Sequence, residues 1–519
     1  MTGAGSGDTR AEAPTLPAGV FDVLDRPLRN SPHHPALVTS QGETSYAGLD
    51  ALANRASNAL RDLGVNPGDR IAVSLPNDLD IVVAFHGAMR LGAVWVGVNR
   101  ALANPEKAYM VADAGATILL SSDAPLPELP RGAKAVDLET WRGLVASSPP
   151  STLSTRSQPD PFAPAAIAYT SGTTGFPKGA VHCQAGLIMP GAATVARRRW
   201  GPELRKGDSL PLTIVNMMCL TTLLTAQAGG TAVIMEKADT TSIVGYIRRH
   251  RVAVWNGPPA QLHTLLHDES VSPGDLASLR EVWVGGGDCP DLLRTGFEQR
   301  FGVPVSRTYG LTEAPALVSI DDLEGPRPPG SSGRPLDHIH IHTGEGGEIV
   351  ISPTRTGPWS GTYRPVLGYW NQPEATSAVL TGDELHTGDL GHLGDDGHLL
   401  VLGRRSQLII RGGANVYPAE VERVLVDAPG VRACAVVGVP DERLGERVGA
   451  VIEPVPGVAP DRGAILAHCR VALAAYKVPE RMEFVEQLPR NQMGKVPRAE
   501  VMEILRVERP TAPDAMIGK

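Results

Sequence analysis

Apolar residues recur along the first two thirds of the chain at two alternating spacings. Between Ser45 and Gly64, leucines and alanines return every three or four positions, which predicts a helix with Ser45 as N-cap and Gly64 as its stop. A strand-like run at 70–75, a helical stretch at 80–91 and a second run at 93–98 follow. Alternation of this kind predicts α/β layers with parallel strands. Further predicted strands lie at 117–120, 165–169, 232–235, 252–255 and 281–284.

The pattern changes after about residue 344, where Gly/Asp-rich turns separate short alternating runs that suit β hairpins. We place the main boundary at Arg405/Ser406. Beyond it we expect a small α+β unit with strands at 408–410, 433–437 and 450–455 and helices at 418–427 and 464–470. The predicted division is a disordered tail (1–18), an N-terminal domain of layered α/β subdomains plus a β-rich lobe (19–405), a C-terminal domain (406–508) and a tail (509–519).

Composition argues against binding of nucleic acid or zinc and against a secreted or membrane-bound protein. Aromatic residues make up only 4% of the 519 residues and the net charge is −8, which argues against nucleic-acid binding. The five cysteines lack Cys-x-x-Cys spacing, so neither a zinc site nor a disulfide framework is indicated. No signal peptide is visible, and no apolar run approaches the roughly 20 residues that span a bilayer. We expect a cytoplasmic protein without a membrane partner.

One segment, YTSGTTGFPKG at 169–179, concentrates glycines, hydroxyls and one lysine directly after a predicted strand. Its glycines let backbone N–H groups turn toward an anion, its hydroxyls add donors and Lys178 adds charge, so the segment predicts a phosphate-binding loop. It is not a Walker A loop, because Gly179 follows Lys178 where Ser or Thr is required. A flexible linker is the alternative interpretation.

Four further segments accompany this loop in order: TYGLTEAP (308–315), HTGDLG (386–391), GRRSQLIIRGGANVYPAEVE (403–422) and LPRNQMGKVPR (488–498). Together the five resemble the adenylate-forming superfamily of acyl-CoA synthetases, carrier-protein adenylation domains and luciferases, from about residue 20 to 505. The resemblance implies two steps. A carboxylate attacks the α-phosphate of Mg-ATP to give an acyl-adenylate and pyrophosphate, and a thiol then displaces AMP to give a thioester.

The resemblance also implies roles in ATP binding. Glu313 would bind Mg²⁺, which prefers oxygen ligands, and Thr312 a phosphate oxygen. Tyr309 would lie against the adenine, Asp389 would accept hydrogen bonds from both ribose hydroxyls and Arg404 would reinforce them. The glycines near 286 would face the other side of the adenine, or simply form a strand-to-helix turn. The full set of ATP-binding residues is Thr170, Ser171, Gly172, Thr173, Thr174, Gly175, Lys178, Gly285, Gly286, Gly287, Thr308, Tyr309, Gly310, Thr312, Asp389, Arg404 and Lys495.

The same resemblance implies which residues catalyse the reaction and which part of the chain moves. Lys495 matches the family's C-terminal lysine, which would bridge the substrate carboxylate and the α-phosphate; Lys178, Thr312 and Glu313 complete the catalytic set. The C-terminal domain would then be a mobile lid that swings about Ser406, where the family usually carries Asp or Lys. Gly412 and Gly413 would form the tunnel for the pantetheine arm of coenzyme A.

The acid pocket matches the stretch 210–220, which in the family follows a strand ending in Pro-Leu. A buried helix without a role in specificity is the alternative. No Asp in 213–218 marks an amino-group site, and Asp288, where the family often has Pro, either contacts a polar substituent or caps a turn. We therefore expect a medium-to-bulky apolar, aryl or polycyclic acid. Predicted lining residues are Thr213, Ile214, Met217, Met218, Asn256, Gly257, Gly310 and Ala314.

Free coenzyme A is the favoured thiol, because the chain carries no carrier-like domain. Arg197–Arg199 either attract the anionic coenzyme or form a helix end in solvent. A ligase that loads a separate carrier protein and a noncatalytic sensor of nucleotide or acyl-adenylate are the alternatives. Whether the chain forms a homodimer stays open.

Overall fold

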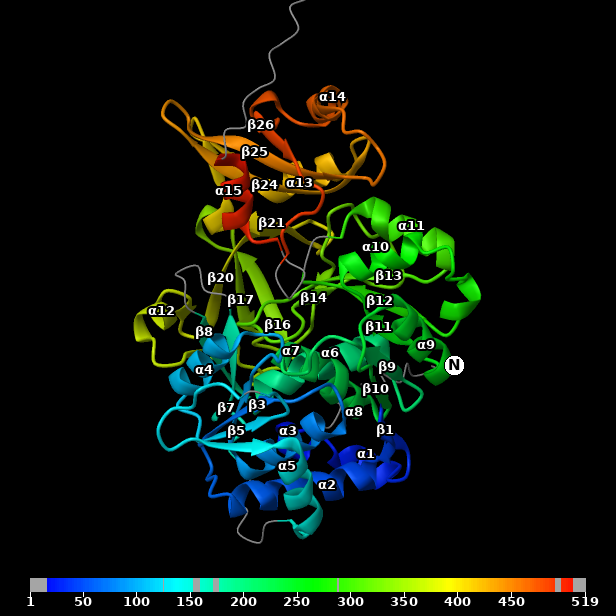
Figure 1. Ribbon diagram of the computed structural model, residues 1–519, viewed down its shortest axis with the longest axis vertical. Coiled ribbons are helices and arrows are strands. Elements are labelled where there is room, and N and C mark those ends of the chain that lie inside the picture. The colour runs from blue at the N-terminus through cyan, green and yellow to red at the C-terminus, as the bar shows by residue number, and fades with distance from the viewer. Residues whose placement is uncertain are drawn as a thin grey trace, which may run out of the picture.

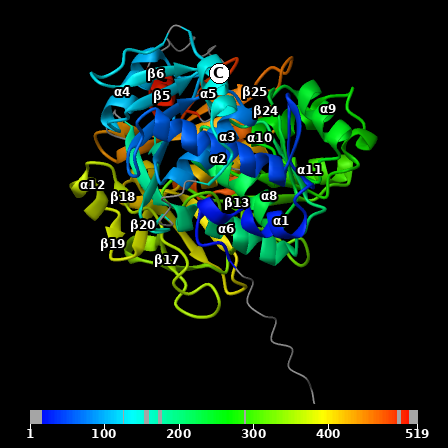
Figure 2. The ribbon, with the colours of Figure 1, turned by 90° about the horizontal axis from the view of Figure 1, so that it is seen from below.

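The computed structural model describes residues 16–124, 126–152, 159–170, 177–286, 289–490 and 496–506. A smaller unit of orange and red elements is stacked on one end of a large body (Figure 1). Viewed from below, the blue-cyan and green halves of the body lie side by side, and a yellow-green lobe adjoins them (Figure 2). The predicted fold class, layered α/β subdomains with a β-rich lobe and a small α+β C-terminal domain, is confirmed.

The first half of the body is built on a seven-stranded sheet in the order β18-β8-β7-β4-β3-β5-β6. Its central strands pair in parallel, as the alternation of strands and helices predicts. The strands are β3 (Arg70–Ser74), β4 (Val94–Gly97), β5 (Ile118–Ser121), β6 (Lys134–Asp137), β7 (Pro164–Thr170), β8 (Lys178–Cys183) and β18 (Gly368–Tyr369), and the helices are α2 (Tyr46–Asp62), α3 (Leu79–Leu91), α4 (Asn104–Asp113) and α5 (Leu138–Ser147).

The second half is built on a nine-stranded sheet in the order β15-β14-β13-β12-β11-β9-β10-β1-β2, whose six central strands are parallel. The strands are β1 (Pro35–Thr39), β2 (Gly42–Ser45), β9 (Arg205–Asp208), β10 (Thr231–Ile234), β11 (Val254–Asn256), β12 (Glu281–Val284), β13 (Val305–Tyr309), β14 (Ser319–Ile320) and β15 (Arg334–Pro335). The helices are α1 (Asp25–Asn30), α6 (Gln184–Arg198), α7 (Val215–Met218), α8 (Leu224–Ala228), α9 (Thr240–His250), α10 (Pro259–His267) and α11 (Asp291–Phe301).

An antiparallel lobe and the C-terminal unit complete the chain. The lobe holds β16 (Ile339–Thr343), β17 (Glu348–Pro353), β19 (Leu380–Thr381), β20 (Glu384–Leu393), β21 (Leu399–Arg404) and α12 (Pro373–Ser377). A single 3-10 turn, Arg405–Gln407, leads out of it. The C-terminal unit holds β22 (Ile409–Arg411), β23 (Ala414–Val416), β24 (Val431–Asp441), β25 (Gly445–Pro454), β26 (Arg481–Phe484), α13 (Pro418–Val426), α14 (Arg462–Ala472) and α15 (Arg498–Arg506).

The element predictions agree with the structure to within a few residues. Ser45 caps α2 through its hydroxyl, which accepts a hydrogen bond from the Gly48 amide at 3.1 Å. The five cysteines are free. β9 ends at Asp208, and residues 211–213 form a turn, whereas a strand ending in Pro-Leu precedes the acid pocket in the family that the sequence resembles. Among the described residues, no helix has the length and apolar character needed to cross a bilayer.

Candidate active site

The strand that follows the predicted phosphate loop brings Lys178 toward Glu313. Lys178 is the first residue of β8, and β18 pairs with this strand. The Lys178 ammonium lies 5.5 Å from the centre of the Tyr369 ring, and the Tyr369 hydroxyl donates a hydrogen bond to Glu313 Oε1 at 2.6 Å. Burial and the Glu313 charge both raise the pKa of Tyr369. The cation and the carboxylate therefore both contact one tyrosine, the first at its ring and the second at its hydroxyl.

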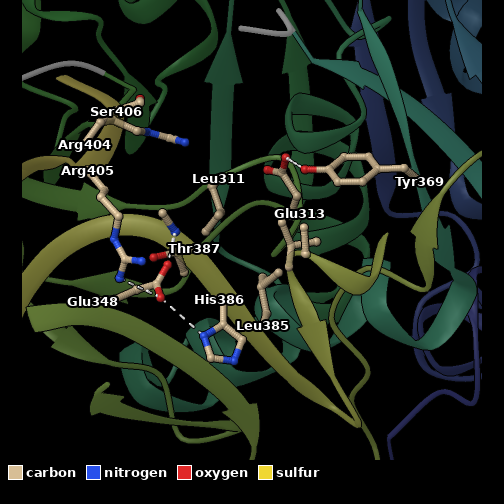
Figure 3. A pocket seen from close by; sticks show the side chains of 13 residues that line it. Leu311, Glu313, Glu348, Tyr369, Leu385, His386, Thr387, Arg404, Arg405 and Ser406 are labelled. Carbon is tan, nitrogen blue, oxygen red and sulfur yellow. Dashed lines mark hydrogen bonds and ion pairs between the residues drawn. The ribbon is translucent and has the colours of Figure 1, made fainter. Parts of the chain in front are cut away.

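Glu313 and Tyr369 open onto a cavity of about 400 Å³ between the body and the β-rich lobe (Figure 3). Figure 3 shows the Glu313 carboxylate turned toward the Tyr369 hydroxyl, and the Glu348 carboxylate turned toward Arg405 and His386. Ser406, the predicted hinge, also lines this space. The lining residues are Leu311, Glu313, Glu348, Tyr369, Ala378, Val379, Leu385, His386, Thr387, Gly388, Arg404, Arg405 and Ser406.

Asp389 lies at the centre of a second set of predicted residues. Asp389 and Arg404 are register partners across β20 and β21, with Arg404 Nε 2.6 Å from Asp389 Oδ1. The Tyr309 hydroxyl donates to Asp389 Oδ2 at 2.5 Å. Burial, and then the Asp389 charge, raise the pKa of Tyr309 well above its usual range, so this hydroxyl stays protonated as a donor at neutral pH. The structure thus brings Tyr309, Asp389 and Arg404 together.

The bulge in β20 that contains Asp389 is fixed by backbone contacts. Thr387 Oγ1 donates to the Ile349 carbonyl at 2.7 Å and accepts from the Asp389 amide at 3.1 Å. Gly388 has φ +70°, a conformation that favours glycine. The Thr-Gly-Asp triplet therefore orients the Asp389 carboxylate through the geometry of this bulge, in addition to the two side chains that contact it.

Gly285 and Gly286 differ in why glycine is needed. A Cβ on Gly285 would lie 2.2 Å from Thr308 Oγ1, so the close packing of β12 against β13 excludes a side chain there. Gly286 has φ +75°, and a Cβ on it would meet no atom of the described residues within 4 Å. The first glycine serves strand packing, whereas the second is needed for its backbone conformation. Gly310 directly follows β13, and Thr312 is half-buried next to Glu313.

Glu348 is a site residue that the sequence analysis missed. Although only 8% exposed, it accepts hydrogen bonds from the Gly388 amide (2.8 Å) and Arg405 Nη2 (3.0 Å), and His386 Nδ1 lies 3.3 Å away. It therefore connects the β20 bulge at Gly388 to the residue that precedes Ser406. In the sequence this glutamate stands at the start of a strand. Every residue of that strand is buried in the structure, and a glutamate is rarely buried unless it is paired.

The predicted acid pocket is a buried helical wall anchored to the sheet. After the turn at 211–213 come α7, a π-helical turn (Cys219–Leu223) and α8, and π-helical turns often occur at functional sites. Fully buried Asp208 accepts from Lys206 Nζ (2.7 Å), Thr221 Oγ1 (2.6 Å) and the Asn256 amide (2.9 Å). Asp208 therefore fixes the π-helical turn and the end of β11 to the same point.

This wall also contacts the other half of the body. A Cβ on Gly97, at the end of β4, would lie 1.8 Å from the Thr213 carbonyl oxygen. The segment around Thr213 therefore lies between the carboxyl ends of strands from both sheets. Open α/β sheets bind their ligands at these ends. Met217, Met218 and Ala314 are buried, and Ile214 is partly buried.

Three polar side-chain atoms in this wall are buried without a hydrogen-bond partner among the described residues. They are Thr213 Oγ1, Asn216 Oδ1 and Asn256 Nδ2. A buried polar group left unpaired costs about 1–3 kcal/mol, and most buried polar groups in proteins are paired. Next to Asn256, a Cβ on Gly257 would lie 2.2 Å from Leu262 Cδ1, so packing requires this glycine.

Not every predicted residue can be placed. Ser171, Gly172, Thr173, Thr174, Gly175, Gly287, Asp288 and Lys495 lie outside the described residues, and Thr170 ends β7 just before them. Gly412 and Gly413 form the turn between β22 and β23, with φ +58° and +84°.

Arg197–Arg199 form the end of α6, as one of the two interpretations expected, and Arg199 is exposed there as its C-cap. The other two are not solvated charges: the buried Arg198 side chain pairs with buried Glu281 at 2.7 Å, and Arg197 Nη2 lies 2.8 Å from Asp337 Oδ1. Arg197 and Arg198 connect α6 to its neighbours because their long side chains reach acceptors beyond the helix end.

Family models match both parts of the chain. The AMP-binding enzyme model matches residues 24–356, and the AMP-binding enzyme C-terminal domain model matches residues 420–495. A feruloyl-CoA synthase of Amycolatopsis sp. is 34% identical over 92% of this chain and 97% of its own length. A long-chain-fatty-acid–CoA ligase of Mycobacterium tuberculosis is 32% identical over 87% and 91%.

A solved structure agrees with these relatives. ATP-bound MatB from Rhodopseudomonas palustris superposes with a TM-score of 0.85 and 28% identity, covering 94% of this chain and 99% of that one. The match extends over both the large body and the C-terminal unit, as the five motifs predicted. The chain therefore belongs to the AMP-binding enzyme family and is an AMP-forming acid–CoA ligase.

Proposed function

We propose that this ligase activates a medium-to-bulky apolar, aryl or polycyclic carboxylic acid and transfers it to coenzyme A. The observation that carries the proposal is that Glu313 and Tyr369 of one predicted set and Arg404 of the other line the same cavity. The buried, methionine-containing wall supports a medium-to-bulky acid. Relatives named for ferulate and for long-chain fatty acids support an acid of this size.

Asp389 is proposed to bind the ribose of ATP. A carboxylate has two oxygens and can accept from both ribose hydroxyls at once. In this structure those oxygens already accept from Tyr309 and face Arg404, so the carboxylate is oriented before the nucleotide arrives. The Tyr309 ring would lie on one face of the adenine, and the backbone at Gly285 and Gly286 on the other.

Glu313 fits a Mg²⁺ ion that accompanies ATP. Mg²⁺ is usually held by one or two carboxylates together with substrate phosphates, and a single carboxylate on an open cavity meets that requirement. No cluster of three or more His, Cys, Asp or Glu occurs in the part of the chain that the structure describes, so a cage made of protein ligands alone is not offered there. The ion would supply charge neutralisation at the phosphates. Lys178, Thr312 and the 171–175 loop would bind the phosphates themselves.

The proposed chemistry has two balanced steps. An oxygen of the acid attacks the α-phosphorus of ATP; the bond to the β-phosphate oxygen breaks, and its electron pair leaves with pyrophosphate. The sulfur of coenzyme A then attacks the acyl carbon, AMP leaves with the electrons of the acyl–oxygen bond, and the thiol proton passes to solvent. Lys495 is assigned to the charge that develops in the first step. Rotation of the 406–508 domain about Ser406 is assigned to the change between steps, with Gly412 and Gly413 on the coenzyme path.

The test is ATP-dependent pyrophosphate release across short aliphatic, long-chain, aryl and polycyclic acids, each with and without coenzyme A. We expect sustained release only with coenzyme A, and only for acids of medium or large size. If coenzyme A does not sustain pyrophosphate release, a carrier protein is favoured as the acceptor. If no acid gives pyrophosphate release, a noncatalytic sensor is favoured.

A further inference from the structure

The buried wall that follows β9 has the chemistry of a site built for a polar substituent. Thr213 and Asn256 are only 5% and 8% exposed, and their Oγ1 and Nδ2 atoms have no partner among the described residues. Asn216 Oδ1 is likewise buried and unpaired. These atoms offer a donor, an acceptor and a group that can act as either. An acid that is apolar throughout would leave all three unsatisfied.

Asn256 is held so that its side-chain amide stays available. Its backbone amide donates to Asp208 Oδ1 at 2.9 Å, and Asp208 is itself fixed by Lys206 and Thr221. This network uses the backbone of Asn256 and none of its side-chain atoms. A rigid residue with a free buried donor can discriminate between ligands, because an occupant lacking an acceptor leaves that donor unpaired.

The three residues lie at or just beyond the carboxyl ends of β9 and β11, the edge at which open α/β sheets bind ligands. The Thr213 carbonyl packs against Gly97 at the end of β4 in the other sheet. The apolar residues beside them, such as Met217 and Met218, would contact the body of the acid. A hydroxyl fits the unpaired set best, because its oxygen can accept from Asn256 while its proton is donated to Asn216 or Thr213.

We propose that Asn256, with Thr213 and Asn216, recognises a hydroxyl or comparable oxygen substituent on the distal part of an otherwise apolar acid. This inference rests on the proposed function and narrows its substrate class. Asn256 is thereby a specificity-determining residue. One neutral hydrogen bond gained in a buried site corresponds to about a tenfold preference in kcat/KM for the substituted acid.

The experiment compares cinnamate with its 2-, 3- and 4-hydroxy derivatives, and decanoate with 10-hydroxydecanoate, by pyrophosphate release with coenzyme A. We expect at least one hydroxylated acid to exceed its parent about tenfold in kcat/KM. In Asn256→Leu, which keeps the volume and removes the donor, this ratio should fall toward one. Ser57→Ala, which removes an equally buried and unpaired hydroxyl from α2, should leave the ratio unchanged.

Thr213→Val, nearly isosteric, provides a second variant in case Asn256→Leu does not fold, and it should also lower the ratio. Equal kcat/KM for every pair in the wild type would overturn the inference while leaving the ligase proposal intact. A preference that survives both Asn256→Leu and Thr213→Val would also overturn it. The absence of pyrophosphate release with every acid, by contrast, would contradict the proposed function on which the inference rests.

Discussion

The Tyr309 hydroxyl donates to Asp389 Oδ2 at 2.5 Å, joining the last residue of β13 to the Thr-Gly-Asp bulge in β20. These residues are 80 positions apart in the chain, and Arg404 contacts the other Asp389 oxygen. The two oxygens proposed to receive the ribose are thus oriented by groups from two different sheets. Nucleotide affinity should therefore depend on how well these sheets hold the carboxylate.

Tyr309→Phe tests this orientation, because it keeps the ring and removes only the donor to Asp389. A hydrogen bond to a charged group contributes about 1.5–3 kcal/mol, so we expect KM for ATP to rise about 10-fold or more. Steady-state pyrophosphate release at varied ATP measures the change. An unaltered KM for ATP in a folded variant would show that the hydroxyl does not orient the ribose site.

Glu313→Gln keeps the shape of the side chain and removes the charge proposed for Mg²⁺. We expect the rate of adenylation to fall about 10²–10³-fold, with a higher Mg²⁺ concentration needed for half-maximal rate. A Mg²⁺ titration of pyrophosphate release measures both effects. Tyr369→Phe, which leaves the carboxylate in place, is the matched control and should change the Mg²⁺ requirement much less. The same Mg²⁺ requirement in Glu313→Gln and wild type would refute the metal assignment.

Lys495→Ala separates the two half-reactions. A preorganised charge in the adenylation step is worth on the order of 10²–10³ in rate, and the second step is proposed to occur after Lys495 has left the site. We expect a severe loss of acyl-adenylate formation and near-normal thioester formation from supplied acyl-adenylate. Rapid-quench assays of each step measure this. Equal losses in both steps would contradict the assignment.

Glu348→Gln should loosen the segment that joins the two parts of the chain, because Arg405 then loses its ionic partner next to Ser406. We expect trypsin to cleave after Arg404 or Arg405 several-fold faster, since a surface ion pair contributes up to about 1 kcal/mol. Limited proteolysis followed by mass spectrometry measures the rate. Asp383→Asn, which breaks the exposed pair with Arg355 elsewhere in the lobe, is the control and should leave cleavage at this segment unaltered.

Buried histidines should make the protein sensitive to mild acid. Burial lowers the pKa of His182 to about 4, and of His86 and His338 to about 3, from the ordinary value of 6.5. Below pH 6.5 the unfolded chain therefore binds protons that the folded protein does not. The contribution of each histidine to stability is complete above pH 6.5 and declines as the pH falls toward its folded pKa, by up to about 2 kcal/mol at pH 5.

Thermal unfolding between pH 7.5 and 5 measures this loss. His338→Leu removes one such group from its place against Tyr363 and should flatten the fall in Tm over that range. His340→Leu, two positions further along in β16 and with its residue exposed, provides the matched control and should preserve the wild-type pH dependence. An identical pH dependence in His338→Leu would show that this histidine is not a source of acid sensitivity.

The sequence predicted the layered fold, and it singled out the residues proposed to bind the nucleotide, because both depend on local patterns. The helix capped by Ser45 and the alternating strands follow from periodicity, and Asp389, Arg404 and Glu313 stand in short contiguous motifs. Glu348 and Asp208 were missed because their importance arises from contacts with residues far away in the sequence. Arg198 was misread because its partner, Glu281, is 83 residues away and buried. Pairings of this kind appear only when the chain is folded.

The most direct test of the ligase assignment is the product balance of one reaction containing ATP, Mg²⁺, coenzyme A and a hydroxycinnamate, with acyl-CoA, AMP and pyrophosphate each quantified. The account predicts equal amounts of the three and none in Asp389→Ala, which lacks the carboxylate proposed to bind the ribose. Formation of ADP and phosphate in place of AMP and pyrophosphate, or full activity in Asp389→Ala, would contradict it.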